Sequence, residues 1–210
     1  MKKEGDLMQK KCPMRCFAVF FLLLLMTCFG SAQNRRDQYD QPEKLAEITG
    51  VKPGIIIGEA GAGRGYLTFY LAELVGPEGR IYANDIDSWS LRLLNERCQR
   101  EGVTNIETVK GEVDDPLFPV GNLDMVVMLR ALHDFTEKEA WLLNLKKYIK
   151  PEAHLVIFEE EDSHTKMSEK FMKELAERTG FELLKHVHIH NGIWLYLLRA
   201  DQRLSSSADR

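Results

Sequence analysis

A short apolar run followed by alternating glycines is the part of the chain best suited to hold a ligand. Ile55-Ile56-Ile57-Gly58 leads directly into Glu59-Ala60-Gly61-Ala62-Gly63-Arg64-Gly65. Glycines allow a tight turn and leave room where a Cβ atom would collide, and a helix starting at Tyr66 would point N–H groups into that room. Asp85 lies about 20 residues beyond the last glycine, where a carboxylate can meet two ribose hydroxyls. The pattern predicts a nucleotide-like ligand.

This layout could bind either a dinucleotide such as NAD or S-adenosylmethionine, and Glu59 is the residue that discriminates between the two. The spacing is E-x-G-x-G-x-G, whereas dinucleotide sites use G-x-G-x-x-G. A carboxylate at the mouth of the loop would face a pyrophosphate, and two unit charges about 4 Å apart interact by on the order of 4 kcal/mol near a protein surface. The ammonium and sulfonium groups of S-adenosylmethionine would be attracted instead. Glu59 therefore favours S-adenosylmethionine, with a nicotinamide-dependent oxidoreductase as the alternative.

His133 and Asp134 are the candidate catalytic residues, because they follow the apolar run Leu123–Leu129. Transfer of a methyl group from a sulfonium depends mainly on in-line positioning, and a base contributes when the acceptor must lose a proton. A lone histidine at a strand end can equally be structural.

Alternation of strand-like and helix-like segments predicts the elements that position these residues. The predicted fold is α/β, a seven-stranded mostly parallel sheet with helices on both faces and an antiparallel C-terminal hairpin strand, in a Rossmann-like arrangement. The expected strands are Ile55–Gly58, Arg80–Ala83, Ile106–Lys110, Leu123–Leu129, His154–Phe158, Phe181–His188 and Ile193–Leu198. The expected helices are Tyr66–Val75, Trp89–Glu101, Thr136 or Lys138 to Tyr148, and Thr165–Thr179.

In chain order, these motifs resemble those of the class I S-adenosylmethionine-dependent methyltransferases, from about Gln41 to Arg199. Glu59–Gly65 resembles the first motif of that family, Asp85 its ribose-binding acid, and Gly111–Pro116 the loop that brackets adenine. Arg130–Phe135 falls at the methyl-transfer site. Gln41-Pro42-Glu43 and the turn Val75–Gly79 are most similar to the small bacterial type 11 and ubiquinone/menaquinone-biosynthesis-like enzymes.

The resemblance implies a set of cofactor-binding residues along the edge of the sheet. They are Glu59, Ala60, Gly61, Gly63, Gly65, Asp85, Ile86, Glu112, Val113 and Arg130. Some of these residues also have a structural interpretation: the glycines as a tight turn, Asp85 as an acid at the start of a helix, and Glu112 as a solvated loop residue. Arg130 departs from the family, because many members have a smaller or acidic residue there, and the chemistry on the acceptor side is left open.

The N-terminal segment has a different composition. Residues 1–32 contain five Lys and Arg before an apolar run at 17–29 and end in small residues, which predicts a secretory signal peptide or a membrane anchor. Residues 33–50 are expected to form a lead-in helix, 51–200 the methyltransferase domain and 201–210 a polar tail. We expect a fairly open substrate pocket, for which 33–50 and 159–167 are the only candidate covers. Export conflicts with a cytosolic methyl donor, so a catalytically silent S-adenosylmethionine- or nucleotide-binding envelope protein is the second hypothesis.

The charge and the cysteine content indicate which kinds of ligand the chain is suited to bind. Without residues 1–32 the chain has 23 Lys and Arg against 30 Asp and Glu and a single cysteine, Cys98. An acidic surface argues against nucleic acid, and a small-molecule or lipid-like methyl acceptor is expected. His186, His188 and His190 alternate on one strand face, which in an edge hairpin is usually the solvated side. The alternation could also suit a metal, but neither cysteine nor a fixed carboxylate accompanies it, so no metal site is predicted. The acids from Glu159 to Asp162 are expected to be solvated, with one of them as a candidate to face the substrate.

Overall fold

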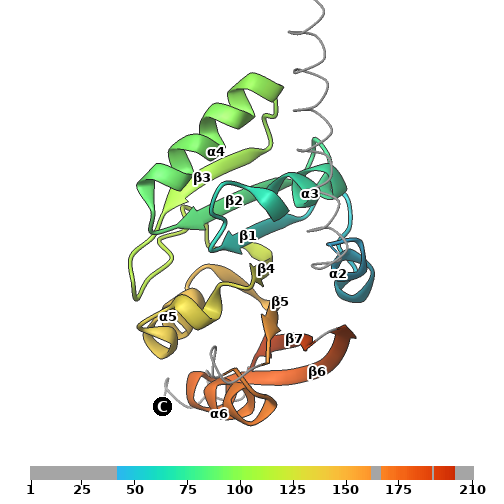
Figure 1. Cartoon of the computed structure of the whole chain (residues 1–210), viewed down its shortest axis with the longest axis vertical. Coiled ribbons are helices and arrows are strands. Elements are labelled where there is room, and N and C mark those ends of the chain that lie inside the picture. Colours follow the sequence, from blue (N-terminus) through green and yellow to red (C-terminus); the bar gives the residue numbers. More distant parts are fainter. Residues whose placement is uncertain (1–41, 162–166, 191, 202–210) are drawn as a thin grey trace, which may run out of the picture. The chain divides into compact units, whose positions relative to one another are not determined.

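The computed structural model describes residues 42–161, 167–190 and 192–201, which form a seven-stranded sheet flanked by helices (Figure 1). The strand order is β3-β2-β1-β4-β5-β7-β6, which confirms the predicted fold class. The elements are α2 (Pro42–Thr49), β1 (Ile56–Ala60), α3 (Tyr66–Val75), β2 (Arg80–Asp85), α4 (Ser88–Glu101), β3 (Ile106–Lys110), β4 (Leu123–Leu129), the 3₁₀ turn η1 (Leu132–Asp134), α5 (Lys138–Leu145), β5 (Ile149–Glu160), α6 (Glu169–Thr179), β6 (Phe181–His190) and β7 (Ile193–Ala200).

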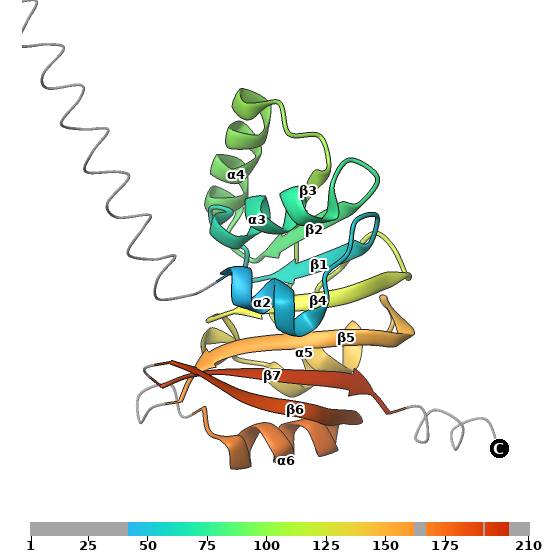
Figure 2. The same cartoon turned by 90° about the vertical axis from the view of Figure 1, so that its right-hand side faces the viewer.

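The sheet is parallel from β3 to β5 and antiparallel at its C-terminal side. β1 pairs with β2 and β4, with Glu59 level with Ala83 and Val127, and β7 runs antiparallel to both β5 and β6. The chain moves outward in opposite directions from β1 and from β4, so the order reverses between these two strands (Figure 2). Ligands of open α/β sheets bind beyond the carboxyl ends of the strands at such a reversal.

Local sequence fixes where the helices begin and end. Asp87 is the N-cap of α4, accepting hydrogen bonds from the backbone N–H groups of Trp89 and Ser90. Ser168 caps α6 in the same way, through Phe171, and Gly180 ends that helix in the left-handed region. Because Asp87 is the N-cap of α4, the carboxylate of Asp85 at the end of β2 does not have to cap this helix.

The main core cluster lies between the sheet and the pair α5 and α6. Buried side chains alternate along the strands that contribute to it, as a two-residue period requires. Its fully or nearly fully buried members include Val126, Met128, Leu155, Ile157, Trp141, Met172, Leu175, Tyr196 and Leu198. These strands and helices therefore hold the carboxyl edge of β4 and β5 rigidly.

The expected helix ending at Tyr148 is wrong at its C-terminus, and the following strand is longer than predicted. α5 stops at Leu145, where short-range bonds to Asn144 and Leu145 close the chain into a turn. Ile149 then pairs with Leu123, and the pairing of β4 with β5 is irregular between Leu123 and Met125. Pro151 lies in this irregular part, where a residue without an N–H is tolerated.

Further differences concern the region after β5. The helix predicted from Thr165 begins at Glu169 instead, because Ser168 provides the cap. Residues 1–41, 162–166, 191 and 202–210 lie outside the described part, and with them the predicted signal segment, the polar tail and most of the expected cover of the pocket. α2 falls within the expected lead-in helix. Among the described residues, no helix has the length and apolar character needed to cross a membrane.

Candidate active site

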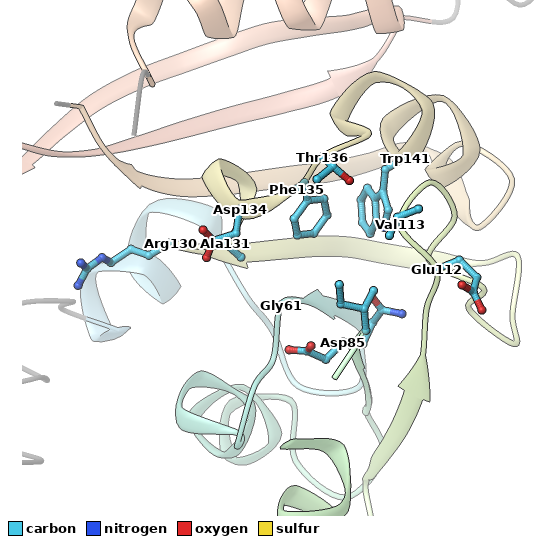
Figure 3. Close-up of a pocket in the computed structure, with 12 residues that line it drawn as sticks. Gly61, Asp85, Glu112, Val113, Arg130, Ala131, Asp134, Phe135, Thr136 and Trp141 are labelled. Carbon is cyan, nitrogen blue, oxygen red and sulfur yellow. The ribbon is translucent and has the colours of Figure 1, made fainter. Parts of the chain in front are cut away.

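A pocket of about 350 Å³ lies at the carboxyl ends of β1 to β4 (Figure 3). Every one of these strands, or the loop that follows it, contributes to the wall. The lining residues are Gly61, Asn84, Asp85, Ile86, Glu112, Val113, Arg130, Ala131, Asp134, Phe135, Thr136 and Trp141. Seven of the residues singled out from the sequence are brought together here: Gly61, Asp85, Ile86, Glu112, Val113, Arg130 and Asp134.

The glycine loop approaches the end of β4 too closely for any other residue. Gly61 has a φ of 73°, and a Cβ atom on it would lie 2.4 Å from the Cβ atom of Ala131. The backbone N–H groups of the loop are used within the protein: Ala62 donates to the carbonyl of Asn84 at 3.0 Å and Gly63 to Asp85 Oδ2 at 2.8 Å. These two donors hold the loop in shape, whereas the N–H groups that the sequence predicts to point at the ligand are those at the start of the helix that begins at Tyr66.

Asp85 stands between the glycine loop and α4. Its Oδ2 accepts from Gly63, and its Oδ1 accepts from the N–H of Asp87 at 2.8 Å. A carboxylate has about four acceptor positions, so each oxygen keeps one for a ligand hydroxyl. The two bonds fix the orientation of the carboxylate at the pocket wall.

Glu59 and Ala60 lie deeper than expected. Glu59 belongs to β1 and is 2% exposed, and Ala60 is fully buried. Neither residue lines the pocket, so the expectation of a carboxylate at the loop mouth is corrected. The reason is that β1 continues through Ala60, whereas the apolar run suggested a strand ending at Gly58.

Two exposed apolar side chains face the pocket on the β2 and β3 side. Ile86 is 58% exposed and Val113 is 50% exposed. Asn84 links this side to the glycine loop: it is buried, its Nδ2 donates to the carbonyl of Pro116 at 2.6 Å, and its carbonyl accepts from Ala62. A flat apolar group can therefore be held between Ile86 and Val113 without moving the loops.

Glu159 is the residue that sequence reasoning misjudged. Its side chain is fully buried at the end of β5, and its Oε2 lies 2.9 Å from His133 Nδ1. Its Oε1 also accepts from the backbone N–H of His133 at 3.1 Å. The carboxylate contacts the ring at Nδ1 and so orients it, which leaves Nε2 on the opposite side of the ring. Nε2 lies 3.5 Å from Asp134 Oδ2, and Asp134 lines the pocket.

Lys138 anchors the turn that carries His133. Its Nζ donates to the carbonyl of His133 at 3.0 Å and to that of Phe135. Burial lowers the pKa of Lys138, while the carboxylates of Glu159 and Asp134 act in the opposite direction. His133 itself does not line the pocket, but its Nε2 is next to Asp134, which does. The turn thus holds an oriented imidazole next to the cavity.

Arg130 ends β4 in an unusual conformation, with a φ of 52°. Its N–H continues the sheet by donating to the carbonyl of Phe158 at 2.7 Å, and its Nη2 lies 3.4 Å from Glu160 Oε2. Figure 3 shows its side chain on the side opposite to Glu112, with the guanidinium extending away from the other lining residues.

The histidines of β6 are engaged with aromatic rings. His186 is stacked against Tyr196 and Trp194, with ring centroids 4.5 and 4.2 Å away, and its Nε2 lies 3.1 Å from Glu161 Oε1. The expectation of a solvated face is therefore wrong for His186. Within the part of the chain that the structure describes, no group of three or more metal-binding side chains is found.

The strand order, the glycine loop and the acid at the end of β2 together define a class I, Rossmann-like methyltransferase. The family model described as "Methyltransferase domain" matches residues 52–202. This chain belongs to that family, as its motifs predicted. S-adenosylmethionine is the cofactor that this assignment implies.

Two curated relatives are ubiquinone/menaquinone biosynthesis C-methyltransferases. The UbiE protein of Ectopseudomonas mendocina (strain ymp) is 31% identical over 114 residues, 54% of this chain and 44% of the relative. UbiE of Shewanella sp. (strain W3-18-1) is 25% identical over 139 residues, 66% of this chain and 54% of the relative. The chain spans about half the length of these relatives.

Solved structures show the same fold. An S-adenosylmethionine-dependent methyltransferase from Aquifex aeolicus matches with a TM-score of 0.73 and 26% identity, covering 78% of this chain and 91% of that one. A TehB-like methyltransferase from Corynebacterium glutamicum matches with a TM-score of 0.62 and 17% identity, covering 82% and 97%.

The residues present fit S-adenosylmethionine. Gly61 lines the pocket without a side chain, and Asp85 keeps acceptor positions for ribose hydroxyls. Ile86 and Val113 offer apolar surface to a flat base, and Asp134 offers negative charge toward the other end. A dinucleotide pyrophosphate would instead find the loop donors of Ala62 and Gly63 engaged.

Proposed function

We propose that the protein transfers a methyl group from S-adenosylmethionine to a small aromatic acceptor of the quinol type that gives up a proton. The observation that carries the proposal is the combination of the pocket with the oriented His133–Glu159 pair beside it. When bound, the cofactor supplies a methyl group on an electrophilic sulfonium. The two relatives named as ubiquinone/menaquinone biosynthesis C-methyltransferases support a quinone-type acceptor.

The residues on the acceptor side suit an aromatic ring with an acidic hydroxyl. Phe135 and Trp141 line the pocket, with their rings edge to face at 5.2 Å between centroids. Such a pair offers an apolar wall to a further ring. Asp134 can receive the hydroxyl, and Nε2 of His133 next to it can accept the proton, while Glu159 stabilises the imidazolium. Loss of that proton raises the electron density of the ring that receives the methyl group.

Calorimetric titration of the purified protein with S-adenosylmethionine, S-adenosylhomocysteine and NAD tests the proposal at the cofactor. We expect micromolar affinity for the first two ligands and no heat with NAD. Asp85→Ala removes the oriented carboxylate and should weaken binding by about tenfold or more. Asp87→Ala is the matched control, because that neighbouring acid caps α4 and does not line the pocket. Absence of binding by the unaltered protein would contradict the proposal.

An acceptor assay separates the enzyme from a silent binding protein. An active enzyme should form S-adenosylhomocysteine only when a hydroquinone or other phenolic compound is added. Binding of the cofactor without any turnover over a panel of such acceptors would support the second hypothesis.

We also propose that residues 1–32 direct the protein out of the cytosol or anchor it to the membrane through the apolar run at 17–29. The basic flank and the short apolar run support export or anchoring at the membrane. A membrane anchor would bring the site close to a lipid-like acceptor. Fractionation of cells that express the full chain tests the proposal, and recovery of the intact protein only from the cytosol would contradict it.

A further inference from the structure

Lys138 carries a positive charge at a position that disfavours one. It is the first residue of α5, directly after the N-cap Glu137, and the partial positive charge of a helix N-terminus repels a cation there. The side chain is also partly buried, and this loss of water lowers the pKa of Lys138. The side chain of Glu137 makes no capping hydrogen bond. The ammonium group therefore needs contacts that compensate for both effects.

The compensating contacts come from the turn η1 and from the end of β5. Nζ of Lys138 donates to the carbonyl of His133 at 3.0 Å and to the carbonyl of Phe135. Against the effect of burial, the carboxylates of Glu159 and Asp134 raise the pKa of the lysine. The side chain thus joins α5 to two carbonyls of the turn and lies near two acids.

The turn that Lys138 holds forms one wall of the pocket. Asp134, Phe135 and Thr136 line the pocket one after another, on the side away from Asp85 (Figure 3). The N–H groups of Asp134 and Phe135 each donate within the turn at 3.1 Å, and such short-range bonds have poorer geometry than those of an α-helix. Two further bonds to its carbonyls therefore restrict the movement of this wall.

Charged groups from three elements lie around the His133 ring. Glu159, at the end of β5, lies 2.9 Å from Nδ1, and Asp134, on the turn itself, lies 3.5 Å from Nε2. Two carboxylates favour the charged form of a ring between them, and an imidazolium cannot accept a further proton. The ammonium group of Lys138, on α5, is bound to the carbonyl of the same histidine and acts in the opposite direction.

We propose that Lys138 is a positioning residue of the acceptor site, which fixes the turn through two carbonyls and keeps the His133 imidazole able to accept a proton. The inference rests on the proposed function, which supplies the acceptor and the need for a base. The proton passes from the acceptor hydroxyl to Nε2 of His133, and the ammonium group keeps its own protons. A substitution of Lys138 should therefore affect the acceptor half of the reaction and spare the cofactor half.

An NMR titration of the histidine rings tests the role of the charge without any acceptor. The signal of His133 is assigned by its loss in His133→Ala. Lys138→Met keeps an apolar stem and removes the charge, so the midpoint of the His133 titration should rise by about half a pH unit or more. Lys138→Arg keeps the charge and should restore the midpoint.

Lys146→Met is the matched control on the same helix. Lys146 is the C-cap of α5, burial lowers its pKa as well, and its Nζ lies 5.3 Å from the centre of the Phe181 ring. It does not line the pocket, and its loss should leave the His133 midpoint unchanged.

Two further measurements separate the two halves of the reaction. Calorimetry should give the same affinity for S-adenosylhomocysteine in Lys138→Met and in the unaltered protein. Turnover with hydroquinone or another phenolic acceptor should fall about tenfold in Lys138→Met, because a base contributes on the order of 10²–10⁴ and only part of that is lost. The acidic limb of its kcat profile should move to higher pH together with the NMR midpoint.

Each contrary result overturns a specific statement. An unchanged His133 midpoint in Lys138→Met would reject the role of the charge, and an equal rise in Lys138→Arg would show an effect of packing and reject it as well. Weaker binding of S-adenosylhomocysteine would show a general effect on the pocket. Absence of turnover by the unaltered protein would instead reject the proposed function. If Lys138→Met fails to fold in a thermal melt, Lys138→Gln keeps a donor for the carbonyls, removes the charge alone and should raise the midpoint in the same way.

Discussion

At the scale of single residues, the partnership of His133 with Glu159 leads to a prediction about turnover. His133→Ala should lower kcat by about 100-fold, because a positioned base contributes on the order of 10²–10⁴ to a proton transfer. Glu159→Gln should lower kcat less and alter its pH profile, because the amide orients the ring but cannot stabilise an imidazolium. Binding of S-adenosylhomocysteine, measured by calorimetry, should be unaffected by either change.

Glu161→Gln is the control for these variants. Glu161 lies two residues further along the chain, but its Oε1 pairs with His186 and accepts from Tyr196, away from His133. Its loss should leave kcat unchanged. A similar fall in kcat for Glu161→Gln and Glu159→Gln would show that the acids act through stability alone.

The sequence could have revealed Glu159 through its spacing. Leu155, Ile157 and Glu159 alternate, so a strand continued by two residues places the carboxylate on the same buried face as the two apolar side chains. A run of four acids concealed this signal, because such runs are usually solvated. The lesson is that a charged residue in register with a core face should be tested for a partner.

At the scale of elements, the contact of the glycine loop with the end of β4 leads to a second prediction. Gly61→Ala should lower the free energy of unfolding by about 3 kcal/mol, since the new Cβ would overlap that of Ala131 and the backbone has a positive φ. Gly54→Ala is the control: its φ is 84° but nothing lies within 4 Å of the added Cβ. It should cost only about 1 kcal/mol. Urea unfolding measures both, and equal costs would contradict the predicted overlap.

Element boundaries were predictable where a cap or a glycine marks them. The ends of α3, β3 and β4 agree with the sequence expectation, because apolar periodicity and turn residues coincide there. The end of α5 differs, because the local sequence carries a helix-stopping residue only at Pro151, whereas the chain has already entered β5 at Ile149. The pairing of Ile149 with Leu123 is a tertiary contact that no local pattern contains.

At the scale of the whole molecule, Tyr148 gives stability a dependence on alkaline pH. Burial, together with the hydrogen bond that Tyr148 donates to Asp115, raises its pKa to about 12. An unfolded tyrosine loses its proton near pH 10. Between these values the folded chain holds the extra proton, so the contribution of this residue is complete below about pH 10 and disappears as pH rises through 12.

Comparison with Tyr148→Phe isolates that contribution. At pH 7 the variant should be about 1 kcal/mol less stable, the usual value of one hydrogen bond. The difference should shrink as the pH is raised above 10, as measured by urea unfolding at fixed pH values. A difference that stays constant up to pH 12 would show that the Asp115 contact does not control the titration.

The sheet order and the position of the pocket were predictable from the sequence because they follow from alternation and from the carboxyl ends of parallel strands. The burial of Glu59 could not be predicted, because it depends on how far β1 continues. The hydrogen bonds of the loop N–H groups could not be predicted either, because they depend on where Asn84 and Asp85 lie in the folded chain. The family assignment identifies the ligand as S-adenosylmethionine, and the packing of the chain determines which side chains line its pocket.

Asn84 has a consequence for how fast the cofactor can bind. One buried residue holds the glycine loop through its carbonyl and the loop after β3 through its amide. Two facing walls of the pocket are therefore tied together before any ligand arrives. Those loops are therefore already ordered in the folded protein, and binding of the cofactor does not require a separate ordering step. Association should then proceed as a single step whose rate is proportional to ligand concentration, without a slow unimolecular phase of site assembly.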